Sequence, residues 1–455
     1  MSGNGQFIPC TLGLLVALVG GMAVAPAAQL RAGVAKADIT PPPGIQMWGY
    51  AGRKSPSTGT LDPLEARVLV LDDGHTRIGI VALDLGRCFG PAALSQLLHS
   101  VLESSGISTL LVGASHTHSG PVILDSYPDG PPAWEKTALE KIAHAVAQAA
   151  AGLTAARIGV GYGVCYIGYN RLVVKPDGTV KWFGTNPTEV TTSPLDPTVA
   201  VVRVDRQDGS PLAILVNYAC HPVIFAADNV QYSADYPAAM RKTVEENLDG
   251  HPLCLFLQGA CGDINPYHAT TSLKEDALRW RDLTGQRLGE EASRVAKSIV
   301  TRQEPDGQLD YAEDHLRFSL RWDPERFRQA LIKIFGPSSA ETFAPRMEQE
   351  FEFPVSTLLI NKRIALMTMP GEPFVNFQID WRNRCPVADS LFLAYTNGYY
   401  GYLPTIRAAA RGGYGASGAT TWLQVGAGEQ MVDHALVRAY ELLGQLQRAP
   451  AETQF

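Results

Sequence analysis

Two histidines one residue apart are the strongest chemical signal in the sequence. They lie in Ser115–Pro121, which reads Ser-His-Thr-His-Ser-Gly-Pro and directly follows an apolar run that predicts a buried strand. Side chains at positions i and i+2 of an extended chain lie on one face. His116 and His118 can therefore bind one metal jointly, or one imidazole can bind the metal while the other transfers protons. Two solvated turn histidines are the alternative, and the preceding strand favours the metal site.

Other polar residues follow apolar runs in the same way. His221 comes after Leu212–Tyr218, and Glu372 comes after Ile364–Met369. A loop at residues 397–402 then carries three tyrosines. Two histidines and one glutamate are a common ligand set of catalytic zinc, and they leave a coordination position for water. The sequence therefore predicts a metal site built from residues at the ends of several strands.

An alternation of strands and helices is expected to bring these residues together. Five apolar runs predict buried strands, at Leu110–Ser115, Leu212–Tyr218, Leu253–Gln258, Ile364–Met369 and Leu391–Tyr395. Five amphipathic segments predict helices, at Ala133–Ala150, Pro237–Leu248, Leu273–Val300, Pro324–Phe335 and Glu429–Leu446. This alternation predicts a layered α/β architecture, in which ligand sites lie at the ends of strands.

The N-terminal 28 residues differ from the rest of the chain. They contain no charged residue, and the apolar run Thr11–Val24 precedes Ala25-Pro26-Ala27, a small-x-small pattern that signal peptidase requires. The pattern predicts a signal peptide at residues 1–28 and a secreted or periplasmic protein, with an uncleaved signal anchor as the alternative. Residues 29–455 are predicted to form a single domain. Within it, the more charged residues 303–353 are a candidate for a peripheral insertion.

Composition narrows the classes of partner. The chain has 455 residues, of which 45% are hydrophobic and 18% charged, which is typical of a folded globular protein. Its net charge of -7 provides no basic field, so nucleic acid is not an expected partner. No other apolar run is long enough to predict a transmembrane span after signal cleavage. The cysteines after residue 28 show no C-x-x-C spacing, and no particular disulfide is predicted.

These segments together resemble the neutral/alkaline, non-lysosomal ceramidase family, zinc amidases that hydrolyse the N-acyl bond of ceramide. The resemblance begins at Gly33–Pro41, which reads Gly-Val-Ala-Lys-Ala-Asp-Ile-Thr-Pro, includes Ser115–Pro121 and extends to the C-terminal tyrosines. It implies a ceramidase-like catalytic domain of layered mixed β-sheets flanked by helices. It also implies one Zn2+ per chain, a small-molecule or lipid amide as substrate, and a role in sphingolipid metabolism.

The resemblance also assigns roles to single residues. The zinc ligands would be His116, His221, Glu372 and Tyr402. His118 matches a histidine that transfers protons beside the metal. Arg171, in Gly-Tyr-Asn-Arg, matches an arginine that orients substrate or stabilises negative charge. Tyr414, twelve residues beyond Tyr402, matches a tyrosine that contacts substrate.

Two departures from the family concern the substrate and the nucleophile. Asn265 stands where ceramidases carry a serine implicated in catalysis, and the chain ends at Phe455 without their C-terminal immunoglobulin-like domain. Zinc-activated water is therefore the expected nucleophile, with Asn265 as a hydrogen-bond donor to an oxyanion. Hydrolysis of esters, lactones or N-acyl sugars is one alternative function. A non-catalytic, ligand-binding member of the family is the other.

Four further residues have less specific signals. Asp263 is expected to fix its glycine-containing turn. Asp84, after a short apolar run, is a candidate for supporting the site from behind. Tyr399 and Tyr400 are both placed to line the pocket, and their spacing does not distinguish them.

Overall fold

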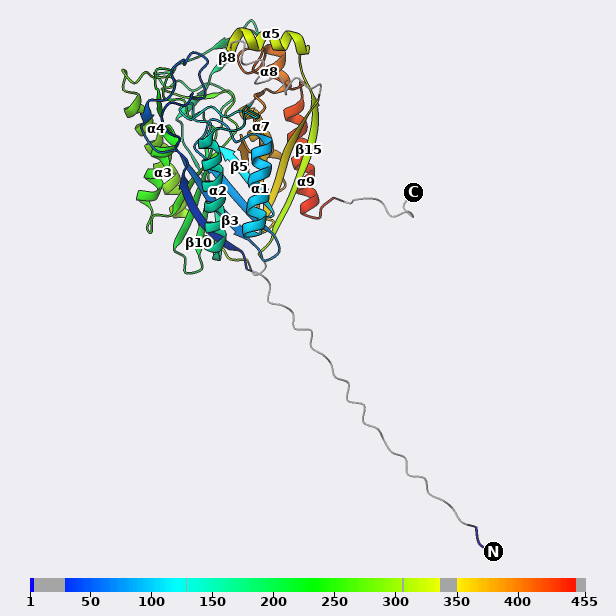
Figure 1. Ribbon diagram of the computed structural model, residues 1–455. Coiled ribbons are helices and arrows are strands. Elements are labelled where there is room, and N and C mark those ends of the chain that lie inside the picture. The colour runs from blue at the N-terminus through cyan, green and yellow to red at the C-terminus, as the bar shows by residue number, and fades with distance from the viewer. Residues whose placement is uncertain (4–28, 128, 305–306, 336–349, 447–455) are drawn as a thin grey trace.

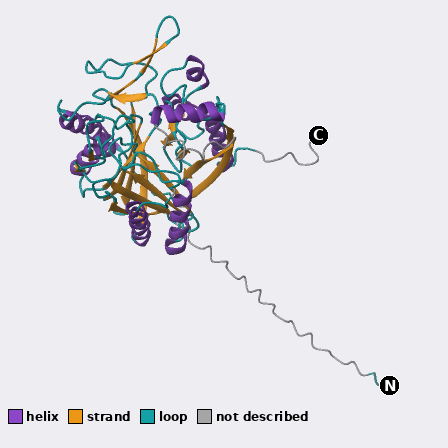
Figure 2. Cartoon of the chain, turned by 45° about the horizontal axis from the view of Figure 1, so that its top comes forward, coloured by secondary structure: helices purple, strands orange, loops and turns teal. Residues whose placement is uncertain are grey.

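The computed structural model describes residues 1–3, 29–127, 129–304, 307–335 and 350–446 (Figure 1). Residues 4–28 lie outside the described part, so the predicted signal peptide is almost wholly outside it. Two β-sheets form the centre of the molecule, and helices cover them (Figure 2). The predicted α/β class of layered mixed sheets flanked by helices is confirmed.

The larger sheet has eight strands, with antiparallel pairs in its middle and one parallel pair at each edge. Its spatial order is β13 (Leu253–Gln258), β11 (Pro211–Tyr218), β10 (Thr198–Arg206), β6 (Thr154–Val164), β1 (Arg31–Asp38), β3 (Glu65–Asp72), β4 (Arg77–Leu83) and β5 (Thr109–Ala114). The parallel pairs are β11 with β13 and β4 with β5. Each needs a crossover connection, and a helix supplies it: α3 (Tyr236–Asn247) for the first and α1 (Pro91–Ser105) for the second.

The smaller sheet repeats this edge arrangement. Its order is β15 (Leu309–Ser319), β16 (Glu350–Ile360), β17 (Ile364–Met369) and β19 (Asp389–Ala394). The first three strands pair antiparallel, whereas β17 and β19 are parallel and are joined through α7 (Val375–Arg384). Residues 309–319, from the candidate insertion at 303–353, form β15, and that part of the segment therefore belongs to the sheet.

Three buried layers hold these sheets and helices together. Strand β3 shows why, because alternate residues face opposite layers and both sets are apolar. Leu69 and Leu71 face a cluster between the two sheets, whereas Val68 and Val70 face a cluster under α1 and α2 (Ala133–Ala151). A third cluster lies under α3, α4 (Ala277–Ser298), α5 (Pro324–Phe335) and α9 (Ala427–Leu442). Within the described residues, no helix combines the length and apolar character needed to cross a membrane.

Short elements gather at one end of the strands (Figure 1). They are two-stranded pairs and one short helix: β2 (Gly59–Thr60) with β12 (Gln231–Tyr232), β7 (Gly168–Asn170) with β14 (Ile264–Pro266), β8 (Leu172–Val174) with β9 (Val180–Trp182), β18 (Glu372–Pro373) with β20 (Tyr402–Leu403), and α8 (Ile406–Arg411). The site residues lie on these elements and on the loops between them. All six cysteines in the described residues have free thiols.

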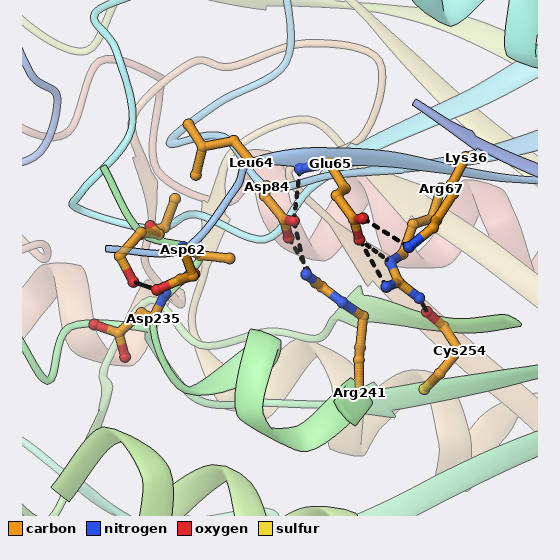
Figure 3. Close-up of polar contacts among 12 residues, drawn as sticks. Lys36, Asp62, Leu64, Glu65, Arg67, Asp84, Asp235, Arg241 and Cys254 are labelled. Atoms are coloured by element: carbon orange, nitrogen blue, oxygen red, sulfur yellow. Dashed lines mark hydrogen bonds and ion pairs between the residues drawn. The ribbon is translucent and has the colours of Figure 1, made fainter. Parts of the chain in front are cut away.

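Buried ion pairs fasten α3 to the large sheet (Figure 3). The carboxylate of Asp84 accepts hydrogen bonds from both terminal nitrogens of Arg241 on α3, at 2.6 and 2.7 Å, and one from the Glu65 backbone N–H. Beside them, Arg67 pairs with Glu65 at 2.6 Å and donates to the Cys254 carbonyl. Buried charges need such partners. Asp84 therefore serves the packing of α3.

Candidate metal centre and active site

The predicted metal ligands meet where three parallel strand pairs end. His116 follows β5, His221 follows β11 and Glu372 follows β17, and each of these strands belongs to one of the three parallel pairs. The edge strand β19 of the smaller sheet contacts the large sheet near both of its edges. The Asn217 side chain on β11 donates to the Phe392 carbonyl, and the Ala114 N–H on β5 donates to the carbonyl of Tyr395, just after β19. The carboxyl ends of these strands therefore converge on one place, as in other α/β ligand sites.

His116 and His221 present the same nitrogen to the site. The Nδ1 atom of His116 lies 2.6 Å from the Gly86 carbonyl oxygen, and that of His221 lies 3.0 Å from the Ile264 carbonyl oxygen. A carbonyl can only accept, so each neutral ring carries its hydrogen on Nδ1 and has a lone pair on Nε2. Carbonyl partners of this kind fix the tautomer and orientation of metal-binding histidines.

Glu372 completes a group of three buried donor atoms. Its Oε2 atom lies 3.4 Å from Nε2 of His116 and 3.3 Å from Nε2 of His221. The preceding Gly371 has φ 156°, and a Cβ there would lie 2.8 Å from the Gly401 carbonyl oxygen. Only glycine allows this close approach of the two loops, which brings Glu372 to the histidines.

The three donors fit a metal ion. Ligand atoms about 2.0–2.1 Å from a tetrahedral zinc are about 3.3–3.4 Å from one another. The separations of 3.3 and 3.4 Å match that value. Two nitrogen lone pairs also face a carboxylate oxygen, an arrangement that is repulsive unless a cation lies between them. The donor set and its spacing therefore fit the metal that the sequence predicts.

His118 lies close enough to belong to the same group. Its Nε2 atom is 3.4 Å from Nε2 of His116, and the ligand atoms of the three histidines all lie within 4.8 Å of one another. Its Nδ1 atom is buried without a hydrogen-bond partner in the described part of the chain. The close approach of residue 49 requires glycine, since a Cβ there would lie 2.4 Å from the His118 ring. The geometry suits either metal binding or proton transfer.

Tyr402 and Arg171 form the next layer of the site. In the β18–β20 pair Tyr402 lies directly opposite Glu372. The Tyr402 hydroxyl accepts a hydrogen bond of 2.9 Å from Nη2 of Arg171, which also donates to the Gly262 carbonyl. The guanidinium of Arg171 lies 5.0 Å from the centre of the Trp182 ring and 5.2 Å from that of Tyr414. Arg171 therefore places a positive charge next to the Tyr402 hydroxyl without lining the pocket itself.

Asn265 lies behind Arg171. Its Oδ1 atom accepts a 2.9 Å hydrogen bond from Nη1 of Arg171, and the residue is buried on β14. Through Oδ1 the Asn265 side chain orients Arg171. The predicted donation to an oxyanion concerns its Nδ2 atom and stays a prediction. The neighbouring Asp263 accepts from the Asn170 side chain and the Val375 N–H, and it thus fixes the turn as expected. Burial raises the pKa of Asp263 to about 6.

Three residues that contact the predicted ligands or their neighbours could not be identified from residue spacing in the sequence. The Tyr399 hydroxyl donates to Oε1 of Glu372, and the Tyr395 ring stacks on His116 with ring centres 4.3 Å apart. The guanidinium of Arg87, which pairs with Asp125, lies 5.1 Å from the centre of the Tyr399 ring. Tyr399 is therefore the pocket tyrosine that supports Glu372, a predicted ligand. The Tyr400 hydroxyl instead donates to the distant Glu352 carbonyl.

A pocket of about 540 Å³ opens onto the donor atoms. His116, His118, Glu372, Tyr402 and Tyr414 contribute to its lining. Most of the remaining wall is apolar, and its large aliphatic and tryptophan side chains come from four separate segments: Met47, Trp48, Val122, Leu124, Leu331 and Trp422. The pocket thus combines polar groups at the donor atoms with walls suited to an apolar substrate group. Neither Arg171 nor Asn265 lines it.

The N-terminal wall of this pocket is clamped in place. Arg53 is buried and donates to the carbonyl oxygens of Trp48 and His118, at 2.7 and 2.8 Å. The Tyr50 hydroxyl donates to the Phe225 carbonyl at 2.6 Å, and its ring meets the His118 ring edge to face. These contacts fix the segment 48–53 against the loop that follows His221.

Burial controls ionisation at the site. It lowers the pKa of His118 well below its usual value, with the neighbouring His116 and His221 adding to the effect. It also lowers the pKa of His221 to about 4, aided by the charge of Arg171. Burial raises the pKa of Glu372, but the electrostatic influence of His116 and His221 beside its carboxylate outweighs burial and holds that pKa well below its usual range. Near neutral pH, the imidazoles of His118 and His221 are therefore neutral beside an ionised Glu372 carboxylate, as metal binding requires.

Two solved structures share this architecture. The first, a crystal structure of neutral ceramidase from Pseudomonas aeruginosa, is 18% identical with a TM-score of 0.73, over 93% of this chain and 76% of that chain. The second, a ceramidase complexed with C2, is 18% identical with a TM-score of 0.72, over 94% of this chain and 78% of that chain. No protein-family model and no curated protein matches the sequence. The likeness covers more than nine-tenths of this chain, which accordingly has the neutral ceramidase fold.

Proposed function

We propose that this protein is a zinc-dependent hydrolase of an amide (N-acyl) bond, with a single zinc bound by His116, His221, Glu372 and Tyr402. The observation that carries the proposal is the spacing of the buried donor atoms, 3.3 and 3.4 Å apart, at the inner end of the pocket. The ceramidase fold supports the choice of an amide as substrate. One zinc per chain would lower the pKa of a water molecule toward neutrality and polarise a carbonyl group.

The residues around the donors have separate tasks in this proposal. The neutral imidazole of His118 lies in the pocket beside His116, where it can accept a proton from the attacking water and return it to the leaving amine. Arg171 holds the Tyr402 hydroxyl by a direct hydrogen bond. Its positive charge would stabilise the negative charge that develops on the substrate carbonyl oxygen in the transition state. Asn265 orients Arg171, and Tyr399 orients Glu372.

The pocket wall indicates the kind of substrate. Its apolar side chains fit an acyl or other apolar group, and Tyr414 at the mouth is half exposed and free to contact the leaving part of the molecule. We therefore include linear amides of small molecules and of lipids, ceramide among them. Residues 29–455 would act as one domain in a secreted or periplasmic protein after removal of residues 1–28.

A substrate panel with and without a chelator tests this proposal. The panel contains N-acyl amides of increasing chain length together with matched esters, lactones and N-acyl sugars. Chelation should abolish hydrolysis of the amides, and one equivalent of zinc should restore it. Activity that survives complete metal removal would refute the metal mechanism. Hydrolysis confined to esters or sugars would reassign the substrate class, and a metal-loaded protein inert toward the whole panel would identify a binding protein.

A further inference from the structure

A group of exposed residues outside the site described above lies beside the pocket mouth. The hairpin 172–182, made of β8 and β9, and the segment 405–415, which contains α8, are named here the rim surface. Both parts border a small buried cluster that includes Leu172 and Tyr402, and a Cβ on Gly413 would lie 3.0 Å from Val180. Figure 1 places β8 and α8 together at the end of the molecule where the short elements gather. Tyr414 belongs to the rim surface and also lines the pocket.

The rim surface exposes large apolar side chains. Val174 is 43% exposed, Trp182 44%, Tyr414 49% and Ile406 52%. The rings of Trp182 and Tyr414 pack against each other with centres 4.9 Å apart. Backbone hydrogen bonds close the hairpin turn, including one of 2.8 Å from the Lys175 N–H to the Thr179 carbonyl. An ordered hairpin that holds apolar side chains in solvent indicates a binding surface.

The charges among these side chains are mostly positive. Four exposed basic residues lie on the rim surface, and none forms an ion pair with any residue that the structure describes: Lys175, Lys181, Arg407 and Arg411. Its one acidic residue, Asp177, accepts hydrogen bonds from the N–H and hydroxyl of Thr179. Glu429 from α9 accepts from the Ile406 N–H at one border. On a chain of net charge -7, this is a local positive patch.

We propose that the rim surface docks the protein onto an anionic phospholipid bilayer, with the pocket mouth beside the lipid. Lysine and arginine attract acidic headgroups, and tryptophan and tyrosine prefer the depth of the headgroups because their rings are amphipathic. Val174 and Ile406 can enter the apolar boundary below. A nucleic acid would use the same cations, but it offers no partner for exposed valine and isoleucine. The docking goes beyond the proposed hydrolysis and does not depend on it.

Cosedimentation with vesicles tests the docking directly. The full protein is mixed with vesicles of phosphatidylcholine alone or of phosphatidylcholine with phosphatidylglycerol, at low and at high salt. Binding should require phosphatidylglycerol and weaken with salt. The double variant Lys175→Glu/Lys181→Glu should weaken binding by on the order of twentyfold, and Val174→Gln/Ile406→Gln should weaken it at both salt concentrations. Neither variant alters the donor atoms, so hydrolysis of a soluble amide should stay unchanged.

Matched controls separate docking from net charge and from catalysis. Lys242→Glu/Lys297→Glu makes the same charge change on exposed residues of α3 and α4, and it should leave vesicle binding within about twofold of the original. Equal losses in the two charge variants, or equal binding to both kinds of vesicle, would overturn the proposal. Binding to a nucleic acid but to neither vesicle would do the same. His221→Ala should still bind vesicles, so the docking and the hydrolysis can fail separately.

Discussion

Two buried charge clusters in this molecule differ in how their charges are compensated. The Asp84 carboxylate meets both terminal nitrogens of Arg241 and one backbone N–H, so each charge faces its opposite (Figure 3). The Glu372 carboxylate, equally buried, receives a hydrogen bond from Tyr399 on one oxygen. Its other oxygen faces the Nε2 lone pairs of His116 and His221.

The difference separates a structural cluster from a functional one. The Asp84–Arg241 pair is electrically complete and can serve packing without a further ligand. The Glu372 cluster lacks a positive charge at its centre, because the Nδ1 hydrogens of both histidines are already given to backbone carbonyls. The metal ion proposed above would supply the missing charge. Each of the following predictions tests one side of this contrast.

Removal of a ligand should have the largest effect. His116→Ala and His221→Ala should each lose bound metal on dialysis and lower the rate by on the order of 10³-fold or more, because a Lewis acid contributes several kcal/mol to such reactions. Elemental analysis and the amide assay measure the two losses. Chelator should lower the Tm of the natural protein but not of these variants. Full zinc content in either variant would contradict the assignment.

His118→Ala should separate proton transfer from metal binding. The variant should retain its zinc and lose about 10²–10⁴-fold in kcat, the range expected for a missing general acid–base group. Zinc content and kcat are measured on the same preparation. Loss of metal equal to that of His116→Ala would place His118 among the ligands, which its 3.4 Å separation from His116 also allows.

Breaking the complete cluster should affect stability alone. Arg241→Met leaves the Asp84 carboxylate buried and unpaired, and should lower the free energy of unfolding by about 3–5 kcal/mol. Denaturant titration, with and without chelator, measures the change, which should be the same in both conditions. Lys242→Met, on the exposed side of the same helix, is the control and should have little effect. A selective loss of zinc from Arg241→Met would contradict the structural role of the pair.

The sequence predicted the positions of the donor residues better than it predicted the residues that hold them. His116, His221 and Glu372 were predicted as ligands because each follows an apolar run, and in the structure a strand of a parallel pair ends shortly before each of them. The five predicted strands and five predicted helices all form, within a few residues at their ends. Strands β1, β6 and β10 were not predicted, because charged residues or glycines interrupt their apolar runs.

The residues that hold the predicted ligands in place are determined by contacts between segments far apart in the sequence. Tyr399 and Tyr400 are adjacent in the sequence, yet their hydroxyls donate to Glu372 and to the Glu352 carbonyl respectively. No pattern of spacing distinguishes two neighbours whose roles are set by the packing of β16 and β18. The role of Arg87 likewise follows from its position over Tyr399, which lies more than three hundred residues further along the chain.

Tyr399→Phe should have a moderate effect on metal affinity. The change removes the hydroxyl that holds Oε1 of Glu372 and leaves the ring in place, and should weaken zinc binding by about 10–100-fold. Competition with a fluorescent chelator measures the affinity. Tyr400→Phe is the matched control and should bind zinc as the natural protein does. Equal affinities in the two variants would show that the ligand carboxylate needs no such support.

Asn265→Ala should have the smallest effect on the site. It tests whether the hydrogen bond between Asn265 and Arg171 supports the residues around Glu372. The variant leaves Nη1 of Arg171 buried without its acceptor, at a cost of about 1–3 kcal/mol. Because Arg171 does not line the pocket and contacts two residues that do, Tyr402 and Tyr414, kcat should fall by about tenfold to a hundredfold while zinc content and KM change little. Asn265→Asp supplies an acceptor to the same nitrogen and should restore most of the rate, whereas a direct oxyanion donor would not be rescued by a carboxylate. A wild-type rate for Asn265→Ala would remove the residue from the mechanism, and hydrolysis seen only with Asn265→Ser would show that the natural protein lacks a required serine nucleophile.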